Sequence, residues 1–217
     1  MTGLWVTLGA TLGGPLALAG LIGLGVLVHN LRLDAYLAAS GWRQPEDVPE
    51  GVRNASWSDP GPRVTRRMVR QFGDYQVWMV EASYSADLPA LDVSGPTTSS
   101  VYLNHYVLSL APFLDGRAFP PMQVFPRSRF ARSGRIQDGP DRHFARRFRY
   151  PESGAYRLTP EIRRRMLRRR LPPWRVDGHG YLITCYRSAP SVRTVDRRAR
   201  RAIELAGLLA EPQDELP

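Results

Sequence analysis

The sequence contains no lysine, since all 30 of its Lys and Arg positions are arginine, and it contains a single cysteine, Cys185. The absence of lysine excludes a P-loop lysine, a Schiff-base nucleophile and a Ser-Lys dyad. One cysteine excludes an intramolecular disulfide and a metal site with several cysteine ligands. The 217 residues are 43% hydrophobic and 23% charged, which is typical of a globular protein and excludes a fully disordered chain or a multi-span transporter.

Motifs that would indicate catalysis or metal binding are also absent, namely G-x-S-x-G, H-E-x-x-H and D-x-D. The four histidines are separated from one another and from carboxylate clusters: His29, His105, His143 and His179. Because a metal site needs three or four converging ligands, we predict no catalytic, cofactor-binding or metal-binding residue and no cofactor. Cys185 is predicted to be a buried, unreactive thiol. An enzyme that uses His105 or His143 is the least favoured alternative.

The first 31 residues carry no Asp, Glu, Lys or Arg and consist mostly of Leu, Gly, Ala and Val. About 20 apolar residues suffice to cross a bilayer as a helix, so residues 1–40 are predicted to form a transmembrane anchor with a helical extension that stops at Gly41. Either one helix runs from Leu4 to Val28 with a kink near Pro15, or a shorter helix begins near Gly14 and continues past His29. A cleaved signal peptide, which would need a basic start, and a buried soluble helix are less favoured.

The arginines flank this anchor on one side only. None precedes it, whereas Arg32 and Arg43 follow it. By the positive-inside rule, the protein is predicted to be a single-pass protein of the cell membrane with its C-terminal domain in the cytoplasm. Cys185 agrees with a reducing compartment. The small-xxx-small spacing of Gly9, Gly13 and Ala17 permits weak self-association of the anchor.

A Pro- and Gly-rich linker is predicted for residues 41–62, followed by an α+β domain over 63–209 and an acidic tail over 210–217. The first half of the domain is rich in strand formers. Two strands, Val64–Phe72 and Tyr75–Tyr84, are separated by the turn dipeptide Gly73-Asp74, which favours a hairpin. A third strand is predicted for Ser99–Leu110, after a loop over Pro89–Pro96.

The second half of the domain mixes strands with two amphipathic helices. Two strands, Met122–Phe125 at a sheet edge and His143–Tyr150, precede a helix over Pro160–Leu171 that is capped by Thr159. A hairpin joins Trp174–Val176 to Tyr181–Tyr186 through residues 177–180, and a final helix covers Val192–Leu209. Strands that come in hairpins, with helices late in the chain, predict an α+β fold with a mostly antiparallel sheet.

Several short motifs along this plan are shared with a known group of proteins. They are Gly41-Trp42, the hairpin at Gly73, P-x-x-V-x-P within Pro120–Pro126, FARRFR at Phe144–Arg149, a helix opening that starts L-T-P-E-x-R over Leu158–Leu167, W-R-x-x-G at Trp174–Gly178 and the last helix over Val192–Leu209. The chain thereby resembles a family of uncharacterised single-pass membrane proteins from GC-rich Gram-positive, actinobacterial-type bacteria, with a domain of unknown function. It departs from that pattern at Asp141–Phe144, where the family has an acidic segment before the phenylalanine. The resemblance implies a membrane-tethered architecture and no catalytic residue.

Charge is distributed very unevenly along the chain. Residues 117–201 contain 23 arginines and six acidic residues, whereas residues 1–116 contain seven arginines and ten acidic residues. Such one-sided charge attracts anions. Within the predicted helix over Pro160–Leu171, basic residues lie opposite Ile162, Met166 and Leu167, a pattern typical of membrane-surface helices. The candidate anion-binding residues are Arg163, Arg164, Arg165, Arg168, Arg169 and Arg170.

The predicted function is therefore a membrane-tethered, non-enzymatic interaction or accessory module with an unknown protein partner. The alternative is an anion-binding module that contacts anionic lipid headgroups, the nearest anions to an anchored domain. Nucleic acid is a weaker alternative, because no helix-turn-helix, RRM or zinc-finger signature is present. The arginines could also form an ordinary solvated surface.

Overall fold

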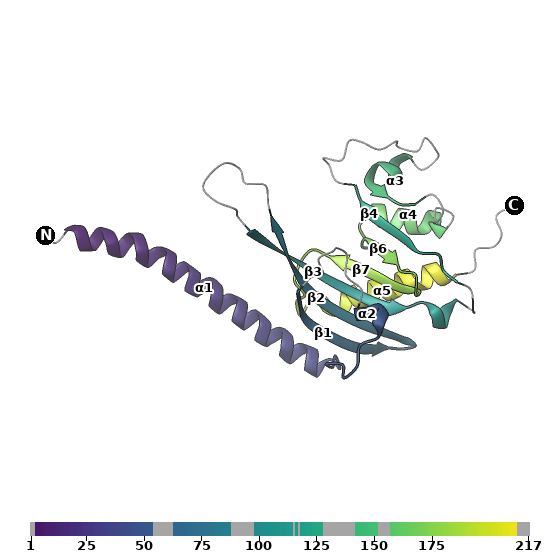
Figure 1. The fold of residues 1–217 in the computed structure, drawn as a ribbon, viewed down its shortest axis with the longest axis horizontal. Coiled ribbons are helices and arrows are strands. Elements are labelled where there is room, and N and C mark those ends of the chain that lie inside the picture. The colour runs from purple at the N-terminus through teal and green to yellow at the C-terminus, as the bar shows by residue number, and fades with distance from the viewer. Residues whose placement is uncertain are drawn as a thin grey trace. The chain divides into compact units, whose positions relative to one another are not determined.

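The computed structural model describes residues 3–53, 63–87, 98–114, 116, 118–127, 142–151 and 157–211. The chain divides into two compact units, residues 1–42 and 43–217 (Figure 1). The predicted loop over Pro89–Pro96 and nearly all of the acidic tail lie outside the described residues.

The first unit is one continuous helix, α1 (Gly3–Ala39). It is longer than either alternative predicted from the sequence, because its backbone continues through Pro15 and past His29. The helix ends as predicted at Gly41, which adopts a φ of +84°. The backbone N–H of Trp42 donates to the carbonyl of Leu37 at 3.0 Å, the bond of a Schellman ending in which glycine supplies the left-handed residue.

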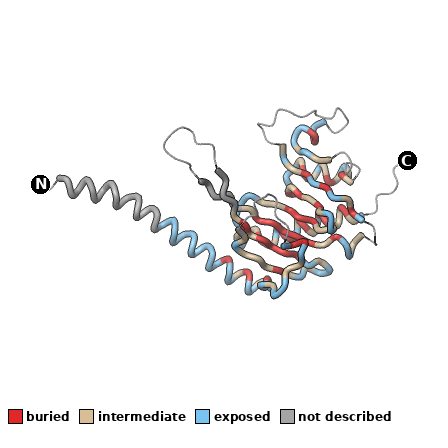
Figure 2. Tube along the Cα trace, viewed as in Figure 1, coloured by how far each residue is buried: buried red, intermediate tan, exposed pale blue. Residues whose placement is uncertain are grey.

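The described C-terminal half of α1 is long and apolar enough to cross a membrane. The stretch Leu21–Ala39 has a mean hydropathy of 1.2. Most of its large apolar side chains are exposed, with exposed fractions of 67% for Leu21, 59% for Ile22 and 60% for Leu31, whereas Leu33 and Leu37 are buried; Figure 2 shows the exposed stretch in pale blue. An exposed apolar surface of this size is typical of a segment that contacts a membrane or another protein.

The second unit contains a seven-stranded sheet in which every pair is antiparallel. This confirms the α+β fold with an antiparallel sheet. The strand order is β1-β2-β3-β7-β6-β4-β5. The strands are β1 (Arg63–Phe72), β2 (Tyr75–Asp87), β3 (Thr98–Ser109), β4 (Met122–Pro126), β5 (Phe148–Arg149), β6 (Trp174–Val176) and β7 (Tyr181–Tyr186).

Both predicted hairpins are confirmed, and local turn chemistry explains each. Phe72 pairs with Tyr75 across the first turn, where Gly73 has a φ of +56°, as a type II′ turn requires. In the second turn, the Asp177 carboxylate accepts hydrogen bonds from the backbone N–H groups of His179 and Tyr181 at 3.0 and 2.8 Å. This Asx-type arrangement fixes the reversal between β6 and β7.

Each face of the sheet has its own core. One face carries a cluster of apolar side chains from β1, β2, β3 and β7, joined by Val52: Val69, Trp78, Val80, Val107 and Ile183. The other face packs against α5 (Val195–Ala210), which contacts β2, β3 and β7. The apolar stripe of α5 is buried, and an ion pair of 2.7 Å between Arg70 and Asp196 joins the helix to β1. Figure 2 shows the buried residues concentrated in these strands and in α5.

Part of the segment predicted as a linker is attached to the sheet. Arg43 exchanges backbone hydrogen bonds with Val69 at 2.9 and 2.8 Å. A one-turn helix, α2 (Glu50–Arg53), places Val52 in the core. Gly51 lies so close to the ring of Tyr181 that an added Cβ would come within 2.3 Å of it, so only glycine fits at that position.

Four predicted elements differ from the structure. The strand over His143–Tyr150 is wrong for most of its length, because residues 142–147 form a helix, α3 (Arg142–Arg147), and only Phe148–Arg149 is extended. Phe144 and Phe148 stack with ring centroids 4.7 Å apart. Their spacing of four residues fits a helical turn as well as an alternating strand, and Ala145 with two arginines favours the helix.

The other three differences concern the ends of two helices and the position of one strand in the sheet. Helix α4 (Pro160–Leu167) ends four residues before the predicted Leu171, and α5 begins at Val195 instead of Val192. Strand β4 is not the outermost strand as predicted, since the short β5 pairs with Phe125 and Pro126. A short 3-10 helix, η1 (Ala111–Phe113), follows β3.

Candidate anion-binding surface

Helix α4 positions the arginines that the sequence singled out. The side chain of Thr159 accepts a hydrogen bond from the backbone N–H of Ile162 at 3.3 Å, and Pro160 occupies the first helical turn. This N-cap is as predicted. Ile162 and Met166 are buried, so the helix is held to the core by one face, and Arg163, Arg164 and Arg165 lie between these two residues on its other sides.

Three of the six candidate arginines are engaged within the domain. Arg164 and Arg165 form ion pairs with Glu161, and Arg165 also pairs with Glu204 of α5. Arg163 is half-buried, and this burial lowers the pKa of its guanidinium. These three side chains therefore interact mainly with the domain itself.

The other three, Arg168, Arg169 and Arg170, follow the end of α4 and are exposed. The backbone N–H of Arg170 donates to the carbonyl of Arg165, and that of Arg169 donates to Met166, both at 2.9 Å. This is a Schellman ending in which Arg169 takes the left-handed position with a φ of +56°. Within the described part of the chain, no ion pair involves these three arginines.

Because an arginine occupies a position that favours glycine, the substitution Arg169→Gly is expected to stabilise the domain. A left-handed conformation costs a residue with a Cβ roughly 1–2 kcal/mol, part of which is offset by the greater entropy of glycine in the unfolded chain. We expect a gain of about 1 kcal/mol in the free energy of unfolding, measured by urea denaturation. Arg168→Gly removes the same charge at a φ of −81°, and should not stabilise; equal gains from both variants would contradict the backbone explanation.

A second group of exposed arginines lies on the neighbouring helix, and the sequence did not single it out. Helix α3 packs against α4 (Figure 1). Phe144 and Ala145 face inward and are buried, and the Nε of Arg127 donates to the carbonyl of Ala145 at 2.7 Å. The arginines of α3 and β5 remain exposed and, among the described residues, form no ion pair: Arg142, Arg146, Arg147 and Arg149.

We call these two groups together the arginine surface: Arg142, Arg146, Arg147, Arg149, Arg168, Arg169 and Arg170. Its two halves are separated by about 20 positions in the sequence and belong to two helices that contact each other, α3 and α4. The sequence signal for the arginines of α3 and β5 is the four-residue spacing of Phe144 and Phe148. In a helical turn, this spacing places both rings on one side and leaves the arginines on the other.

The histidines and the cysteine do not form a site in the described structure. His105 is buried in β3 and pairs in register with Cys185 of β7, while His143 and His179 are exposed on α3 and in the β6–β7 turn. Burial raises the pKa of the Cys185 thiol to about 12, although Arg187 and Arg175 act in the opposite direction. A thiol with this pKa is protonated at neutral pH and is a poor nucleophile. The described residues contain no group of three metal-ligating side chains.

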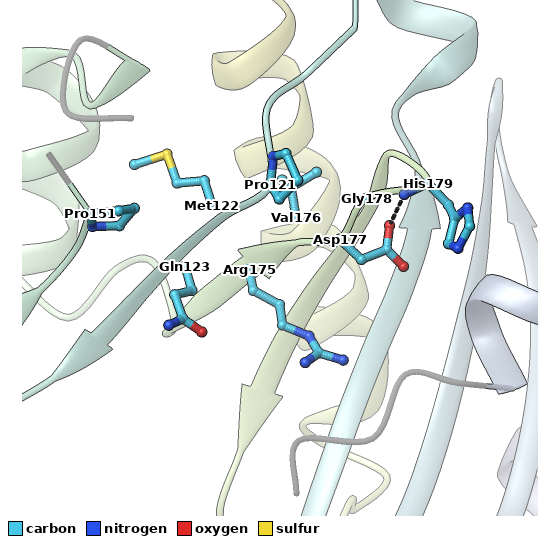
Figure 3. A pocket seen from close by; sticks show the side chains of 9 residues that line it. All are labelled: Pro121, Met122, Gln123, Pro151, Arg175, Val176, Asp177, Gly178 and His179. Atoms are coloured by element: carbon cyan, nitrogen blue, oxygen red, sulfur yellow. Dashed lines mark hydrogen bonds between the residues drawn. The ribbon is translucent and has the colours of Figure 1, made fainter. Parts of the chain in front are cut away.

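An open groove of about 520 Å³ lies along β4 and β6. It is lined by Pro121, Met122, Gln123, Pro151, Arg175, Val176, Asp177, Gly178 and His179. Figure 3 shows the side chains of Gln123 and Arg175 projecting to the same side, with Asp177 turned toward His179. The Asp177 carboxylate is already occupied by the turn, so the groove offers few converging polar groups for chemistry.

Comparison with known proteins assigns the chain to no family and no known fold. No protein-family model, curated protein or solved structure matches the chain.

Proposed function

We propose that the protein is a membrane-tethered, non-enzymatic interaction module with one span in the cell membrane. The length and apolarity of α1 support the span, and its outward-facing leucines suit a lipid environment. A cytoplasmic position of residues 43–217 is supported by the arginines at positions 32 and 43, because no arginine precedes the helix.

The domain, in this proposal, contacts anionic lipid headgroups through the arginine surface. The observation that carries the proposal is the exposure of Arg168, Arg169 and Arg170, which form no ion pair among the described residues. The left-handed conformation of Arg169 is a local strain of the kind found at functional positions. Each arginine near an anionic membrane contributes about 1 kcal/mol, so a few such residues suffice to hold an already tethered domain against the bilayer.

Vesicle binding by residues 41–217 tests the proposal, once far-UV circular dichroism has shown that this fragment is folded. We expect binding to vesicles that contain phosphatidylglycerol and not to phosphatidylcholine vesicles, with a steep loss as salt rises. The triple variant Arg168→Gln, Arg169→Gln, Arg170→Gln should bind about 100-fold more weakly, since it loses roughly 3 kcal/mol of attraction. Exposed substitutions of this kind change the free energy of unfolding little.

A matched triple variant controls for net charge. Arg193, Arg197 and Arg200 are exposed in and just before α5, so their replacement by glutamine removes the same charge from another surface. This variant should retain binding within about threefold of the original. Equal losses in both triple variants, or equal binding to neutral and anionic vesicles, would contradict the proposal. Tighter binding to a nucleic acid than to vesicles at the same salt would favour the nucleic-acid alternative.

A further inference from the structure

Strand β4 lies near one end of the sheet, and most of its outer side has no partner strand among the described residues. The two-residue strand β5 covers only Phe125 and Pro126. Residues 122–124 pair with β6 on their inner side, and beside them lies the open groove of about 520 Å³. An unpaired strand edge next to a groove is a place where an extended segment of another protein can add to a sheet.

The backbone of Gln123 points toward this open side. The backbone N–H of Arg127 donates to the carbonyl of Arg147 at 2.8 Å, in the direction of β5. The pairing of Phe125 with Arg149 keeps the same register without a shift. Since the backbone groups of successive residues alternate between the two sides of a strand, the N–H and C=O of Gln123 lie on the same side as those of Arg127 and point away from β6.

The hydrogen bonds of β6 give the same direction. The N–H of Cys185 donates to the carbonyl of Pro173 at 3.1 Å, so Pro173 and Arg175 turn their backbone groups toward β7. Gln123 pairs in register with Arg175, and two residues whose backbone groups face away from each other form a pair without hydrogen bonds. Among the described residues, no other segment forms a backbone hydrogen bond with Gln123.

Proline explains why β5 does not cover Gln123. In a continued register Pro151 would lie opposite Gln123, but proline has no N–H to donate. Strand β5 therefore ends at Arg149, and Pro151 lines the groove. Pro121, two positions before Gln123, also lacks an N–H. Since prolines limit pairing at a sheet edge, this edge admits a short segment and not an extended sheet.

The side chains beside Gln123 define which segment fits. Figure 3 shows Gln123 and Arg175 projecting to one side of the sheet and Met122 projecting to the other. Neighbouring strands lie about 4.8 Å apart, so a residue added opposite Gln123 is two strand spacings, about 10 Å, from Arg175. Two long side chains span this distance. The residues next to it on the added strand point to the side of Met122.

The charge on the Arg175 side of the groove is positive. Cys185 lies two positions from Ile183, the partner of Arg175, and so faces the same side. Burial raises the pKa of the Cys185 thiol, and the charges of Arg187 and Arg175 act against it, so both cations act on this side of the sheet. The carboxylate that lines the groove, that of Asp177, accepts two N–H groups of the β6–β7 turn. A negative side chain on an added strand is therefore attracted, and a positive one is repelled.

We propose that Gln123 and Arg175 bind an extended segment of a partner protein that carries a glutamate or aspartate opposite Gln123. The backbone N–H and C=O of that acidic residue exchange hydrogen bonds with Gln123, and its carboxylate faces Arg175. Its apolar neighbours lie on the Met122 side. This inference rests on the proposed interaction module, whose protein partner it describes by its chemistry, and it does not involve the arginine surface.

Binding of short peptides to the full-length protein in detergent tests the proposal. The probes are fluorescein-labelled peptides of sequence TVEVT, TVQVT and TVKVT, which differ only in the central residue, and binding is followed by fluorescence anisotropy. We expect saturable binding of TVEVT and about fivefold weaker binding of TVQVT, with TVKVT the weakest, because the ion pair with Arg175 is lost and then reversed. Methylation of the glutamate nitrogen of TVEVT should weaken binding about tenfold, since it removes one backbone hydrogen bond.

Two substitutions at position 123 separate the backbone from the side chain. Gln123→Pro removes the outward N–H and leaves the hydrogen bonds with β6 in place, as proline at a sheet edge does, and should weaken TVEVT binding at least tenfold. Gln123→Ala keeps the N–H and should bind within about threefold of the original protein. Arg175→Gln should remove the preference for TVEVT over TVQVT and leave the affinity for TVQVT unchanged.

Three results would overturn the proposal. They are the absence of saturable TVEVT binding, equal affinity for TVEVT and TVKVT, and unchanged affinity of the methylated peptide, which leaves the protein itself unaltered. Vesicle binding reports separately on the arginine surface, and Gln123→Pro and Arg175→Gln should not change it. Retained binding to anionic vesicles without peptide binding would therefore refute this inference alone.

Discussion

Replacement of Trp174 by alanine is expected to lower the free energy of unfolding by about 4 kcal/mol, as large aromatic-to-alanine changes in cores do. Among the residues whose burial is described, Trp174 is the largest side chain with an exposed fraction of 0%. It pairs with Thr184 of β7 on one side and with Val124 of β4 on the other. Its loss leaves a cavity where the two halves of the sheet meet. A domain of this size has roughly 5–15 kcal/mol of stability, so much of the total would be lost.

Trp174→Phe is the informative control for this prediction. The indole N–H of Trp174 has no hydrogen-bond partner among the described residues, so phenylalanine removes a buried donor while it keeps most of the apolar volume. We expect a loss of about 1 kcal/mol or less for this variant. Urea denaturation followed by circular dichroism measures both values. A similar loss in the two variants would show that the indole N–H is satisfied and that volume is not what matters at this position.

Elements whose signals are local could be predicted from the sequence. The Gly73-Asp74 hairpin and the β6–β7 hairpin depend on turn residues that fix the backbone within a few positions. The N-cap of α4 depends on Thr159 and Pro160 alone, and the end of α1 depends on Gly41. In each case the residues that determine the structure adjoin it in the sequence.

Predictions failed where a local pattern fits two structures. Phe144 and Phe148 lie on one face of either a helix or a strand, and the choice depends on packing against α4, which begins more than ten residues later. The end of α4 could not be located because Arg169, in place of glycine, occupies the left-handed position. A run of arginines gives no sign of which one leaves the helix.

The buried layer under α5 and the arginine surface both depend on contacts between distant parts of the chain. Asn104 meets Tyr186 because β7 pairs with β3, although about 80 residues separate them. Arg198 then reaches the same place from α5. Likewise, the two helices that carry the arginine surface, α3 and α4, contact each other although they are separate in the sequence. Strand order and helix docking of this kind are set by the whole core, so composition revealed the excess of arginine but not which arginines remain exposed.

Reporter fusions at the C-terminus are expected to show a cytoplasmic domain in nearly all molecules. Arg32 and Arg43 follow the apolar stretch and no arginine precedes it, and orientation follows such asymmetry within about 15–20 residues of a span. A fluorescent reporter that matures only in the cytoplasm should therefore be active, and an alkaline phosphatase fusion, active only outside, should be silent. The opposite pattern would refute the assigned orientation.

Moving the charge provides the stronger form of this test. Three arginines inserted after Thr2, combined with Arg32→Gln, place the larger positive charge before the helix and should shift a large fraction of molecules to the opposite orientation. Three glutamates inserted at the same position serve as the matched control, because acidic residues contribute little to orientation. Phosphatase activity should rise with the arginines and not with the glutamates. If both insertions act alike, the length of the N-terminal segment and not its charge would determine the orientation of α1.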